Sequence, residues 1–287
     1  MVNSTRLEAF DVLLWVGNGH HAGRVTALSQ PTISRAAHQV SANLGVHLRK
    51  VQGEWQLTGD MGRLTQVREQ HQTGRLVGKA NARLEAGALS SRLLADPAPT
   101  GWVLGRADAI NQPRSLTLLR QRVIDAWLCT SALDLPDDPD QTLAVMDLFR
   151  APLRLVAGPT HPLVGERGLG LADLASFPSV ALEANWYPNS AARLRENGLW
   201  SSPHRLSHHK PQHWEGRTAD GHTLAYASPW TLARNPELCP LDFDLGLEHT
   251  LALVVLRDLA VHPRIQTLFD ELGRRVAALR EGERLPC

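Results

Sequence analysis

The sequence predicts an α/β protein in three parts: a winged helix-turn-helix over residues 1–60, a long linker helix over residues 61–95 and an α/β domain over residues 96–287. Three observations predict this arrangement: a strong helix start near residue 30, a proline-free stretch after residue 62, and short apolar runs that alternate with helical stretches after residue 101. With 287 residues, of which 43% are hydrophobic and 21% charged, the chain is long enough for two domains and globular in composition.

Three helices are expected at the N-terminus. Apolar residues recur at helical spacing over residues 7–15 and 22–28, with a Gly-containing turn between them. The third helix, over residues 30–43, has the clearest start. Ser29 is a good N-cap because its hydroxyl can accept from the free N–H groups of the first turn, and Pro31 stands where a missing N–H costs nothing. This succession of helices and a turn is typical of a helix-turn-helix.

The predicted third helix has an apolar face and a polar face. Residues at three- and four-residue spacing form the apolar face: Ile33, Ala36, Ala37 and Val40. The polar face carries side chains that read base edges, because Gln can pair bidentately with adenine, Arg with guanine and Ser with either. We therefore expect base contacts from Gln30, Pro31, Ser34 and Arg35. The alternative is an ordinary amphipathic surface helix.

A β-hairpin is expected after this helix, over residues 48–58, with Gln52-Gly53-Glu54 at its tip. Such a hairpin is the wing of a winged helix-turn-helix, and basic side chains on it can contact phosphates. The start of the third helix also favours phosphate, because its free N–H groups and dipole attract an anion. The residues expected to contact the DNA backbone are Ser29, Thr32, His38, Arg49 and Lys50.

The charge of the chain is distributed unevenly. Residues 1–95 hold 11 Lys and Arg against 6 Asp and Glu, a net charge of +5, while the remaining residues hold 19 against 23, a net charge of −4; together these give the overall +1. The positive part is the one that carries the predicted third helix. This asymmetry favours a nucleic-acid partner for the N-terminal part.

The N-terminal part resembles the LysR-type transcriptional regulators of bacteria. The matching residues are Phe10, Ala22, Ser29-Gln30-Pro31, Ser34-Arg35, Val40, Leu44-Gly45-Val46, Leu48 and Leu57-Thr58. Further along, Thr160-His161-Pro162-Leu163 and residues 171–178 resemble the middle of the family's effector domain. The chain departs from the family at Thr26, Ser41, Arg49 and Met61, where an apolar residue, Glu, Phe and Gly are usual. Most of these are scaffold positions, which indicates a divergent member.

The resemblance implies a transcriptional regulator that is not an enzyme. We expect it to be cytoplasmic, because no N-terminal hydrophobic stretch is preceded by basic residues and followed by a cleavage site, and no run is as long as a membrane span. The resemblance further implies binding to double-stranded DNA as a homodimer or homotetramer, a small-molecule effector, and no cofactor or bound metal. Two recognition helices about 34 Å apart would read half-sites one DNA turn apart. The resemblance also implies a periplasmic-binding-protein-like effector domain, with two subdomains and a ligand cleft between them.

A single amphipathic helix is expected over residues 63–94, which lack proline. Its repeating positions are Leu64, Val67, His71, Val77, Ala80, Leu84 and Ala88. Gly74, Gly78 and Gly87 each cost about 1 kcal/mol relative to Ala in a helix, which pairing with a second copy would have to offset. The resemblance implies that this helix is the dimerisation linker; the alternative is a packed helix in a monomer.

The α/β domain is expected to follow a Pro-rich linker at residues 96–101, with mainly parallel strands. The expected strands are residues 102–104, 126–129, 153–157, 179–183 and 251–255, and the expected helices are residues 112–124, 188–197 and 262–279. Residues 103–126 are about half as many as the family usually has there. We therefore expect a reduced first subdomain that lacks one helix and one strand.

Effector contacts are expected from loops that follow strands and from helix starts, where polar groups can converge on an anion. The candidates are Ser115, Thr117, Asn185, Tyr187, Gly221 and Thr223. They could equally be caps and turn residues. A cytoplasmic solute-binding protein without specific DNA binding is therefore a second interpretation of the chain.

A dinucleotide-dependent enzyme is a weaker alternative. Residues 10–22 imitate an apolar strand followed by Gly-x-Gly-x-x-Ala, but no Asp or Glu occurs between Asp11 and Glu54 to bind a ribose. No Gly-x-Ser-x-Gly motif is present either.

Four histidines, His204, His208, His209 and His213, have a spacing that could suit a metal, but Pro203 and Pro211 bracket them and favour a solvated loop. The three widely separated cysteines, Cys129, Cys239 and Cys287, are typical of reduced thiols. No stretch is apolar enough for a membrane span.

Overall fold

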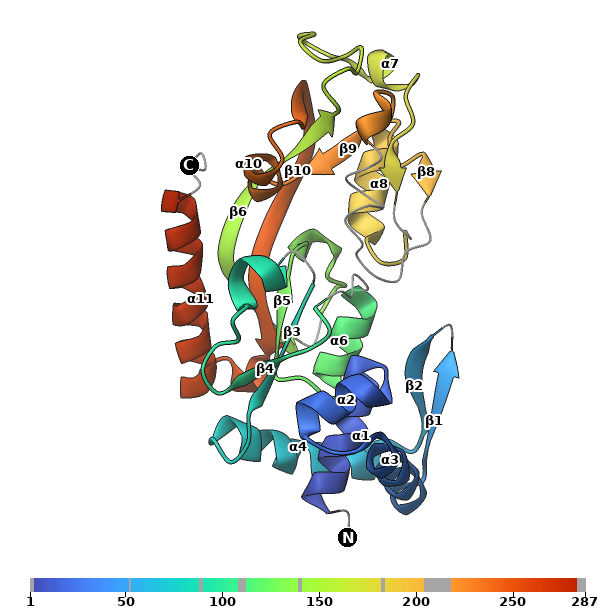
Figure 1. Cartoon of the computed structure of the whole chain (residues 1–287), viewed down its shortest axis with the longest axis vertical. Helices are drawn as coiled ribbons and strands as arrows, with labels where there is room; N and C mark the ends of the chain where they lie inside the picture. The colour runs from blue at the N-terminus through green and yellow to red at the C-terminus, as the bar shows by residue number, and fades with distance from the viewer. Residues whose placement is uncertain are drawn as a thin grey trace.

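The computed structural model describes residues 3–51, 53–87, 90–107, 112–138, 141–181, 184–203 and 218–282. Its parts follow one another along the long axis of the molecule (Figure 1). Helices α1–α4 and a hairpin, which we call the N-terminal unit (residues 3–76), form one end. A six-stranded sheet lies in the middle, and a smaller group of helices and strands forms the other end.

The N-terminal unit contains the helices and the hairpin that the sequence predicts. Its elements are α1 (Ser4–Val16), α2 (Gly19–Thr26), α3 (Gln30–Leu44), the antiparallel strands β1 (Val46–Val51) and β2 (Glu54–Gly59), and α4 (Gly62–Leu76). Asn3 and Asn18 begin α1 and α2 by accepting from backbone N–H groups at 2.8 Å. Residues 10–16 lie in α1 and not in a strand, so the apparent dinucleotide motif is absent.

The prediction of a linker helix over residues 61–95 is wrong in its second half. Helix α4 ends at Leu76, and strand β3 (Ala82–Ala86) and the π-helical turn η1 (Ser91–Ala95) follow it. Gly78 has a φ of 86°, a left-handed conformation that glycine adopts without strain and that ends the helix. All residues of β3 are buried inside the sheet, so pairing with distant strands overrides the helical spacing.

The prediction of a reduced first subdomain that lacks one helix and one strand is wrong for the strand. Strand β3 pairs in parallel with β4 (Trp102–Leu104) and with β5 (Ala126–Cys129), and α6 (Gln112–Arg120) lies between β4 and β5 in the chain. The strand expected to be missing is thus β3. The helix before it is shorter than predicted, because residues 82–86 belong to the sheet.

The sheet is mixed, and not mainly parallel as predicted. Its order is β4-β3-β5-β10-β6-β9, and β10 (Cys239–Leu256) pairs antiparallel with both β5 and β6 (Leu143–Ala157). The predicted strands at residues 153–157 and 251–255 are only the ends of these long strands. Because β6 and β10 run from the middle of the molecule to its far end, they join the two subdomains (Figure 1).

The second subdomain lies around the far ends of β6 and β10. Its other elements are α7 (Leu171–Leu174), β7 (Val180–Ala181), α8 (Pro188–Glu196), β8 (Ser202–Pro203), β9 (Ala225–Ala227) and α10 (Pro229–Arg234). Helix α11 (Pro263–Gly282) returns along the first subdomain. Among the described residues, no helix combines the length and the apolar character needed to cross a membrane.

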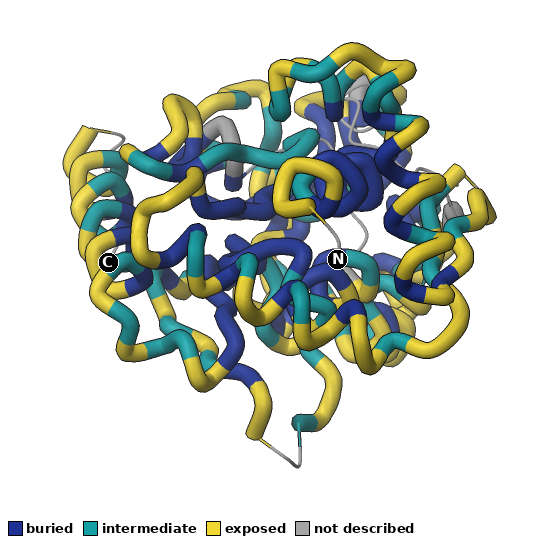
Figure 2. The backbone as a smooth tube through the Cα atoms, turned by 90° about the horizontal axis from the view of Figure 1, so that it is seen from below, coloured by how far each residue is buried: buried dark blue, intermediate teal, exposed yellow. Residues whose placement is uncertain are grey.

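One cluster of buried side chains joins the N-terminal unit to the sheet. Along β5, Trp127 and Cys129 belong to this cluster, whereas Ala126 and Leu128 belong to a second cluster with α11, because successive strand residues point to opposite faces. Helix α6 adds its buried leucines to the first cluster, including Leu119. Seen from the N-terminal end, buried residues fill the interior and exposed residues line the outer turns (Figure 2). The N-terminal unit and the first subdomain therefore share a hydrophobic core.

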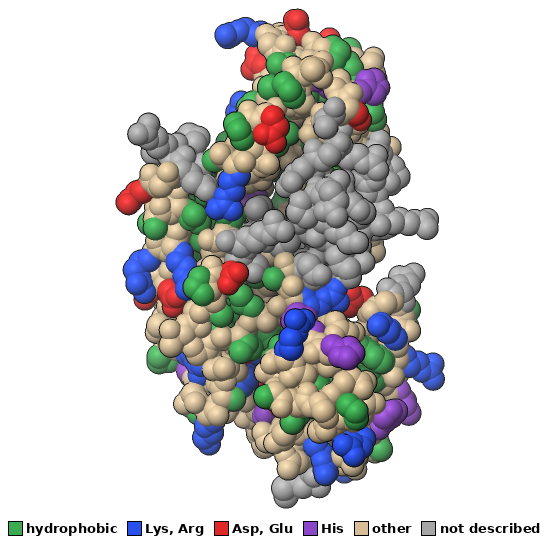
Figure 3. Space-filling view, in the orientation of Figure 1, with side chains coloured by type: hydrophobic (Ala, Val, Ile, Leu, Met, Phe, Trp, Pro, Cys, Tyr) green, Lys and Arg blue, Asp and Glu red, His purple; other side chains and the backbone are tan. Residues whose placement is uncertain are grey.

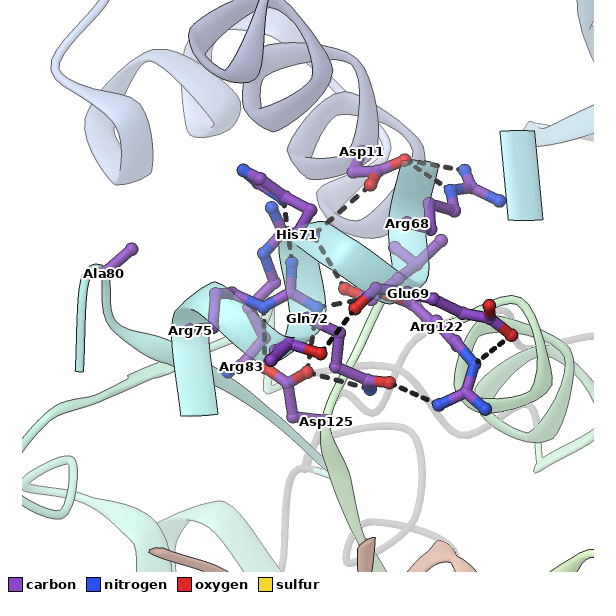
Figure 4. Close-up of polar contacts among 12 residues, drawn as sticks. Asp11, Arg68, Glu69, His71, Gln72, Arg75, Ala80, Arg83, Arg122 and Asp125 are labelled. Atoms are coloured by element: carbon purple, nitrogen blue, oxygen red, sulfur yellow. Dashed lines mark hydrogen bonds and ion pairs between the residues drawn. The ribbon is translucent and has the colours of Figure 1, made fainter. Parts of the chain in front are cut away.

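A buried charge network lies beside this core (Figure 4). The Asp125 carboxylate, which is fully buried, accepts from Arg75 Nε and Nη2 at 2.8 Å each. It also accepts from Gln72 Nε2 at 3.0 Å and from the backbone N–H of Arg83 at 2.8 Å. Since Gln72 and Arg75 belong to α4 and Asp125 precedes β5, the carboxylate ties the N-terminal unit to the sheet.

The network continues into α1 through a second buried carboxylate. Asp11 accepts from Arg68 Nε at 2.9 Å and from Arg68 Nη2 at 2.6 Å. Arg83 Nη1 lies 3.8 Å from the other oxygen of Asp11, and Arg83 Nη2 donates to Glu8 at 2.5 Å. The inner face of α4 is therefore a polar stripe of Arg68, Gln72 and Arg75, which bonds to α1 on one side and to the sheet on the other.

Asp125→Asn tests the contribution of this network. Burial would raise the pKa of Asp125, but Arg75 and then Arg83 outweigh burial and hold the pKa below its ordinary value. A depressed pKa in the folded state adds stability at neutral pH that is lost as the pH falls through that pKa. We expect the substitution to lower the free energy of unfolding by about 3–5 kcal/mol at pH 7, because it leaves Arg75 buried without its counter-charge. Urea unfolding at pH 7 and pH 3 measures this loss, which should shrink below about pH 4.

Asp258→Asn is the matched control. Asp258 accepts from Arg122 Nη2 at 2.8 Å, but its side chain is 55% exposed, so its loss should cost at most about 1 kcal/mol. Equal losses for the two variants would contradict the role given to Asp125.

Candidate nucleic-acid interface

The candidate interface begins at the start of α3, where Ser29 occupies the N-cap position. The backbone carbonyl of Ser29 accepts from Ile33 N at 3.1 Å, as an N-cap carbonyl should. Its hydroxyl makes no hydrogen bond to the helix backbone; it pairs with the Thr32 hydroxyl at 2.9 Å. The predicted cap geometry of the Ser29 side chain is therefore wrong, because a neighbouring hydroxyl takes its place.

The two predicted faces of α3 are confirmed. The apolar stripe is buried: Ile33, Ala36, Ala37 and Val40. On the opposite side Gln30, Pro31, Arg35 and His38 are exposed, and Ser34 and Thr32 are half-buried. Arg35 Nη2 donates to Thr32 Oγ1 at 3.4 Å. Because the stripe fixes the helix against α1 and α2, the polar side chains of the other face remain accessible to solvent.

A groove of about 370 Å³ lies between α3 and the first strand of the hairpin. Four of the residues predicted to contact DNA line it: Gln30, Ser34, His38 and Arg49. The other five, Ser29, Pro31, Thr32, Arg35 and Lys50, do not line the groove. The sequence analysis did not identify His47 and Trp55, which also line it; His47 stands beside Arg49 on an exposed strand position.

Trp55 fixes the hairpin in position beside α3. Its Nε1 donates to the backbone carbonyl of Gly17 at 3.1 Å, which joins β2 to the end of α1. Lys50 Nζ lies 5.7 Å from the centre of the Trp55 ring, a cation–π contact across the hairpin. In the ladder Lys50 pairs with Trp55 and Arg49 with Gln56. The two basic side chains are thus held by the strand that Trp55 anchors.

The electrostatics of this surface favour an anion. No Asp or Glu occurs between residues 12 and 53, which form the end of α1, α2, α3 and β1. The exposed basic side chains of this stretch are Arg24, Arg35, Arg49 and Lys50, and His20, His38 and His47 are exposed as well. In Figure 3, Lys, Arg and His side chains gather over the lower, N-terminal part of the molecule, whereas most Asp and Glu side chains on this face lie higher. Within residues 12–53, no carboxylate competes with a phosphate for these basic side chains.

The structure does not bring the six predicted effector residues together. Thr117 and Asn185 line one cavity of about 490 Å³ between the hairpin and α6, and Thr117 Oγ1 donates to the Pro113 carbonyl at 2.8 Å. Ser115 is buried, and Tyr187 is the N-cap residue of α8. Gly221 and Thr223 belong to a turn before β9, where the Thr223 hydroxyl donates to Asp220 at 2.6 Å.

A further cavity of about 370 Å³ lies between the two subdomains. Pro113, Leu116 and Trp127 line it from the first subdomain and Pro188 and Asn189 from the second. Asn185 and Trp186 line both this cavity and the one beside the hairpin.

The sequence analysis missed Asp134, which also lines this cavity. Its carboxylate accepts from the backbone N–H groups of Asn189 and Ser190 at 2.8 and 2.9 Å. Asp134 thereby caps α8 from the other side of the cavity. Only its place in an Asp- and Pro-rich turn could have indicated this role.

The remaining candidates from the sequence are the four histidines and the cysteines. The histidines His204, His208, His209 and His213 lie outside the described residues. Within the described ranges, no three His, Cys, Asp or Glu side chains are grouped as a metal site requires. Burial raises the pKa of Cys129 to about 12, so this thiol stays protonated at neutral pH.

Comparison with known proteins identifies the family. The family model described as LysR substrate binding domain matches residues 108–277, more than half of the chain. ArgP from Mycobacterium tuberculosis has a similar structure, with 14% identity and a TM-score of 0.57, and the match covers 95% of this chain and 96% of that one. A full-length OxyR variant from Pseudomonas aeruginosa gives 15% identity and a TM-score of 0.55, with 96% and 98% covered. An OxyR mutant from Corynebacterium glutamicum gives 17% identity and a TM-score of 0.51, with 100% and 97% covered.

A comparison with curated proteins gave no match. The fold and the matched domain define a regulator with an effector-type domain, and the chain belongs to the LysR family of transcriptional regulators, which are not enzymes. At these identities the solved structures show a shared fold alone.

Ile33→Ala and Arg35→Ala test the two faces of α3. Ile33 is fully buried, so its truncation should lower the free energy of unfolding by about 2–5 kcal/mol. Arg35 is exposed, so its truncation should change that free energy by no more than about 0.5 kcal/mol. Urea unfolding of both variants measures the difference. A large loss for Arg35→Ala would mean that its side chain packs against the protein and is not available to a partner.

Proposed function

We propose that this protein is a sequence-specific, double-stranded DNA-binding transcriptional regulator of the LysR type whose operator binding is modulated by a small-molecule effector. The single observation that carries the proposal is the exposed polar face of α3 beside a basic hairpin, on a surface without carboxylates between residues 12 and 53. An α-helix of this kind fits the major groove, where base edges can be read. Membership of the LysR family supports the same function and a cytoplasmic location.

The proposed roles divide between bases and phosphates. Base contacts come from the N-terminal half of α3: Gln30, Pro31, Ser34 and Arg35. Phosphate contacts come from the start of α3, its second turn and the hairpin: Ser29, Thr32, His38, Arg49 and Lys50. Exposure of most of these side chains and the groove between α3 and β1 support the assignment. The cavity between the subdomains is the proposed effector site.

A homodimer or homotetramer is proposed from family membership, but α4 is not the expected pairing helix. Leu64 is buried in the core shared with α1, and Leu84 lies inside the sheet, so neither is available to a second copy. The exposed side chains of α4 include Arg63, Gln66 and Gln70, which are polar. A second copy would therefore associate through another surface.

Selection of bound duplexes from a random DNA library tests the proposed function. An enriched motif is the expected result, and an inverted repeat would support binding as a dimer. Absent binding, or equal binding to every sequence, would contradict a sequence-specific regulator and favour a solute-binding sensor.

Arg35→Ala and Lys50→Ala separate base reading from phosphate contact. The first should weaken binding to the selected motif by about 1–3 kcal/mol and flatten the sequence preference, because a bidentate guanine contact is lost. The second should weaken binding to all sequences alike and reduce the slope of log affinity against log salt by about one, because one phosphate contact is lost. Titration of each variant with selected and scrambled duplexes at several salt concentrations measures both effects. If Arg35→Ala weakened the two duplexes equally, Arg35 would not read bases.

A further inference from the structure

Arg114 of α6 connects the effector-type domain to the hairpin. Its Nε donates to Glu54 Oε2 at 2.8 Å, and Glu54 is the first residue of β2. Its Nη2 donates to the carbonyl of Trp15, near the C-terminal end of α1, and lies 3.4 Å from the carbonyl of Leu14. The Arg114 side chain is only 11% exposed. One guanidinium thus binds both the hairpin and α1.

The third contact of Arg114 fixes it to the sheet. Its Nη1 lies 3.4 Å from Glu85 Oε1 in β3, and the other oxygen of Glu85 accepts from Trp15 Nε1. Burial raises the pKa of the Glu85 carboxyl, and Arg114 opposes that rise. A Cβ at Gly105 would lie 2.8 Å from Trp15 Nε1 and closer still to Glu85, so the backbone of Gly105 packs closely against both groups. Arg114 is therefore held by a close-packed junction.

The opposite side of α6 faces the cavity between the subdomains. Leu116 lines that cavity, whereas Thr117 and Leu118 line the cavity beside the hairpin. Pro113, which precedes Arg114, lines both cavities. Asn185 and Trp186 of the second subdomain border both cavities. Helix α6 thus lies between the proposed effector site and the hairpin.

We infer that Arg114 is a positioning residue for DNA binding: from the effector-type domain it sets the position of the hairpin relative to α3. Glu54 pairs with Val51 in the ladder, one position from Lys50, so fixing Glu54 fixes the strand that carries Arg49 and Lys50. Arg114 also neutralises Glu54, a carboxylate that would otherwise repel a nearby phosphate. A shift of α6 would move Arg114 and thereby the hairpin of the same chain, so no second copy is needed. This inference rests on the proposed DNA-binding function.

Arg114→Gln tests the inference, with Arg122→Gln as the matched control. Arg122 is also a partly buried arginine that joins the N-terminal unit to the effector-type domain. It donates to Gln72 of α4 at 2.6 Å and to Asp258 at 2.8 Å, and neither partner belongs to the hairpin. Amide hydrogen exchange of the free protein should accelerate at least about tenfold over residues 54–59 in Arg114→Gln and stay unchanged there in Arg122→Gln. Glu54→Gln removes the hairpin partner of the same ion pair and should accelerate exchange of the same amides. It therefore tests the inference even if Arg114→Gln does not fold.

DNA titration completes the test. Arg114→Gln should weaken binding to the selected duplex about tenfold and reduce the slope of log affinity against log salt by about one, as loss of a hairpin phosphate contact requires. Arg122→Gln should leave both unchanged. Unchanged hairpin exchange in Arg114→Gln and Glu54→Gln, or equal effects of Arg114→Gln and Arg122→Gln, would overturn the inference. If the wild-type protein bound no DNA, the proposed function would fail, and the exchange measurement would still decide whether Arg114 positions the hairpin.

Discussion

The buried carboxylate of Asp125 is the interaction on which the arrangement of this protein depends. It receives four hydrogen bonds from α4 and from the start of β3, and it lies at the start of β5 in the sheet. A carboxylate removed from water is costly unless its partners are in place, so the N-terminal unit is stabilised where it meets the sheet. The shared hydrophobic core acts in the same direction. Together they hold α3 and the hairpin in a defined position relative to the effector-type domain.

This arrangement gives the short α4 a different role from a dimerisation helix. Its inner stripe of Arg68, Gln72 and Arg75 is used in contacts within the chain, and no apolar face comparable to a pairing seam is left on its exposed residues. Arg114 also joins the effector-type domain to the N-terminal unit, and it contacts the hairpin directly through Glu54. Communication between the effector-type domain and the proposed DNA-binding surface can therefore be intramolecular, through packed and hydrogen-bonded groups.

Helix α3 could be predicted because its determinants are local. Pro31, the stripe from Ile33 to Val40 and Gly45 lie within one short segment, and each has a local preference that the fold keeps. The end of the linker helix could not be predicted. The spacing of apolar residues such as Leu64 and Leu84 shows that they are buried, but not whether they pack against a second copy, a helix or a sheet. A buried stripe of arginines has no apolar periodicity to detect. The contacts of Arg114 join residues 29 to 100 positions apart, which no local pattern encodes.

The most direct test of the account is the ratio of affinities for a library-selected duplex and its scrambled counterpart, measured with the wild-type protein at physiological salt. Electrostatic attraction alone binds both duplexes equally, whereas base reading by α3 distinguishes them. If α3 reads bases, the ratio should be at least about 1,000 in favour of the selected duplex. A ratio close to one would contradict base reading by α3.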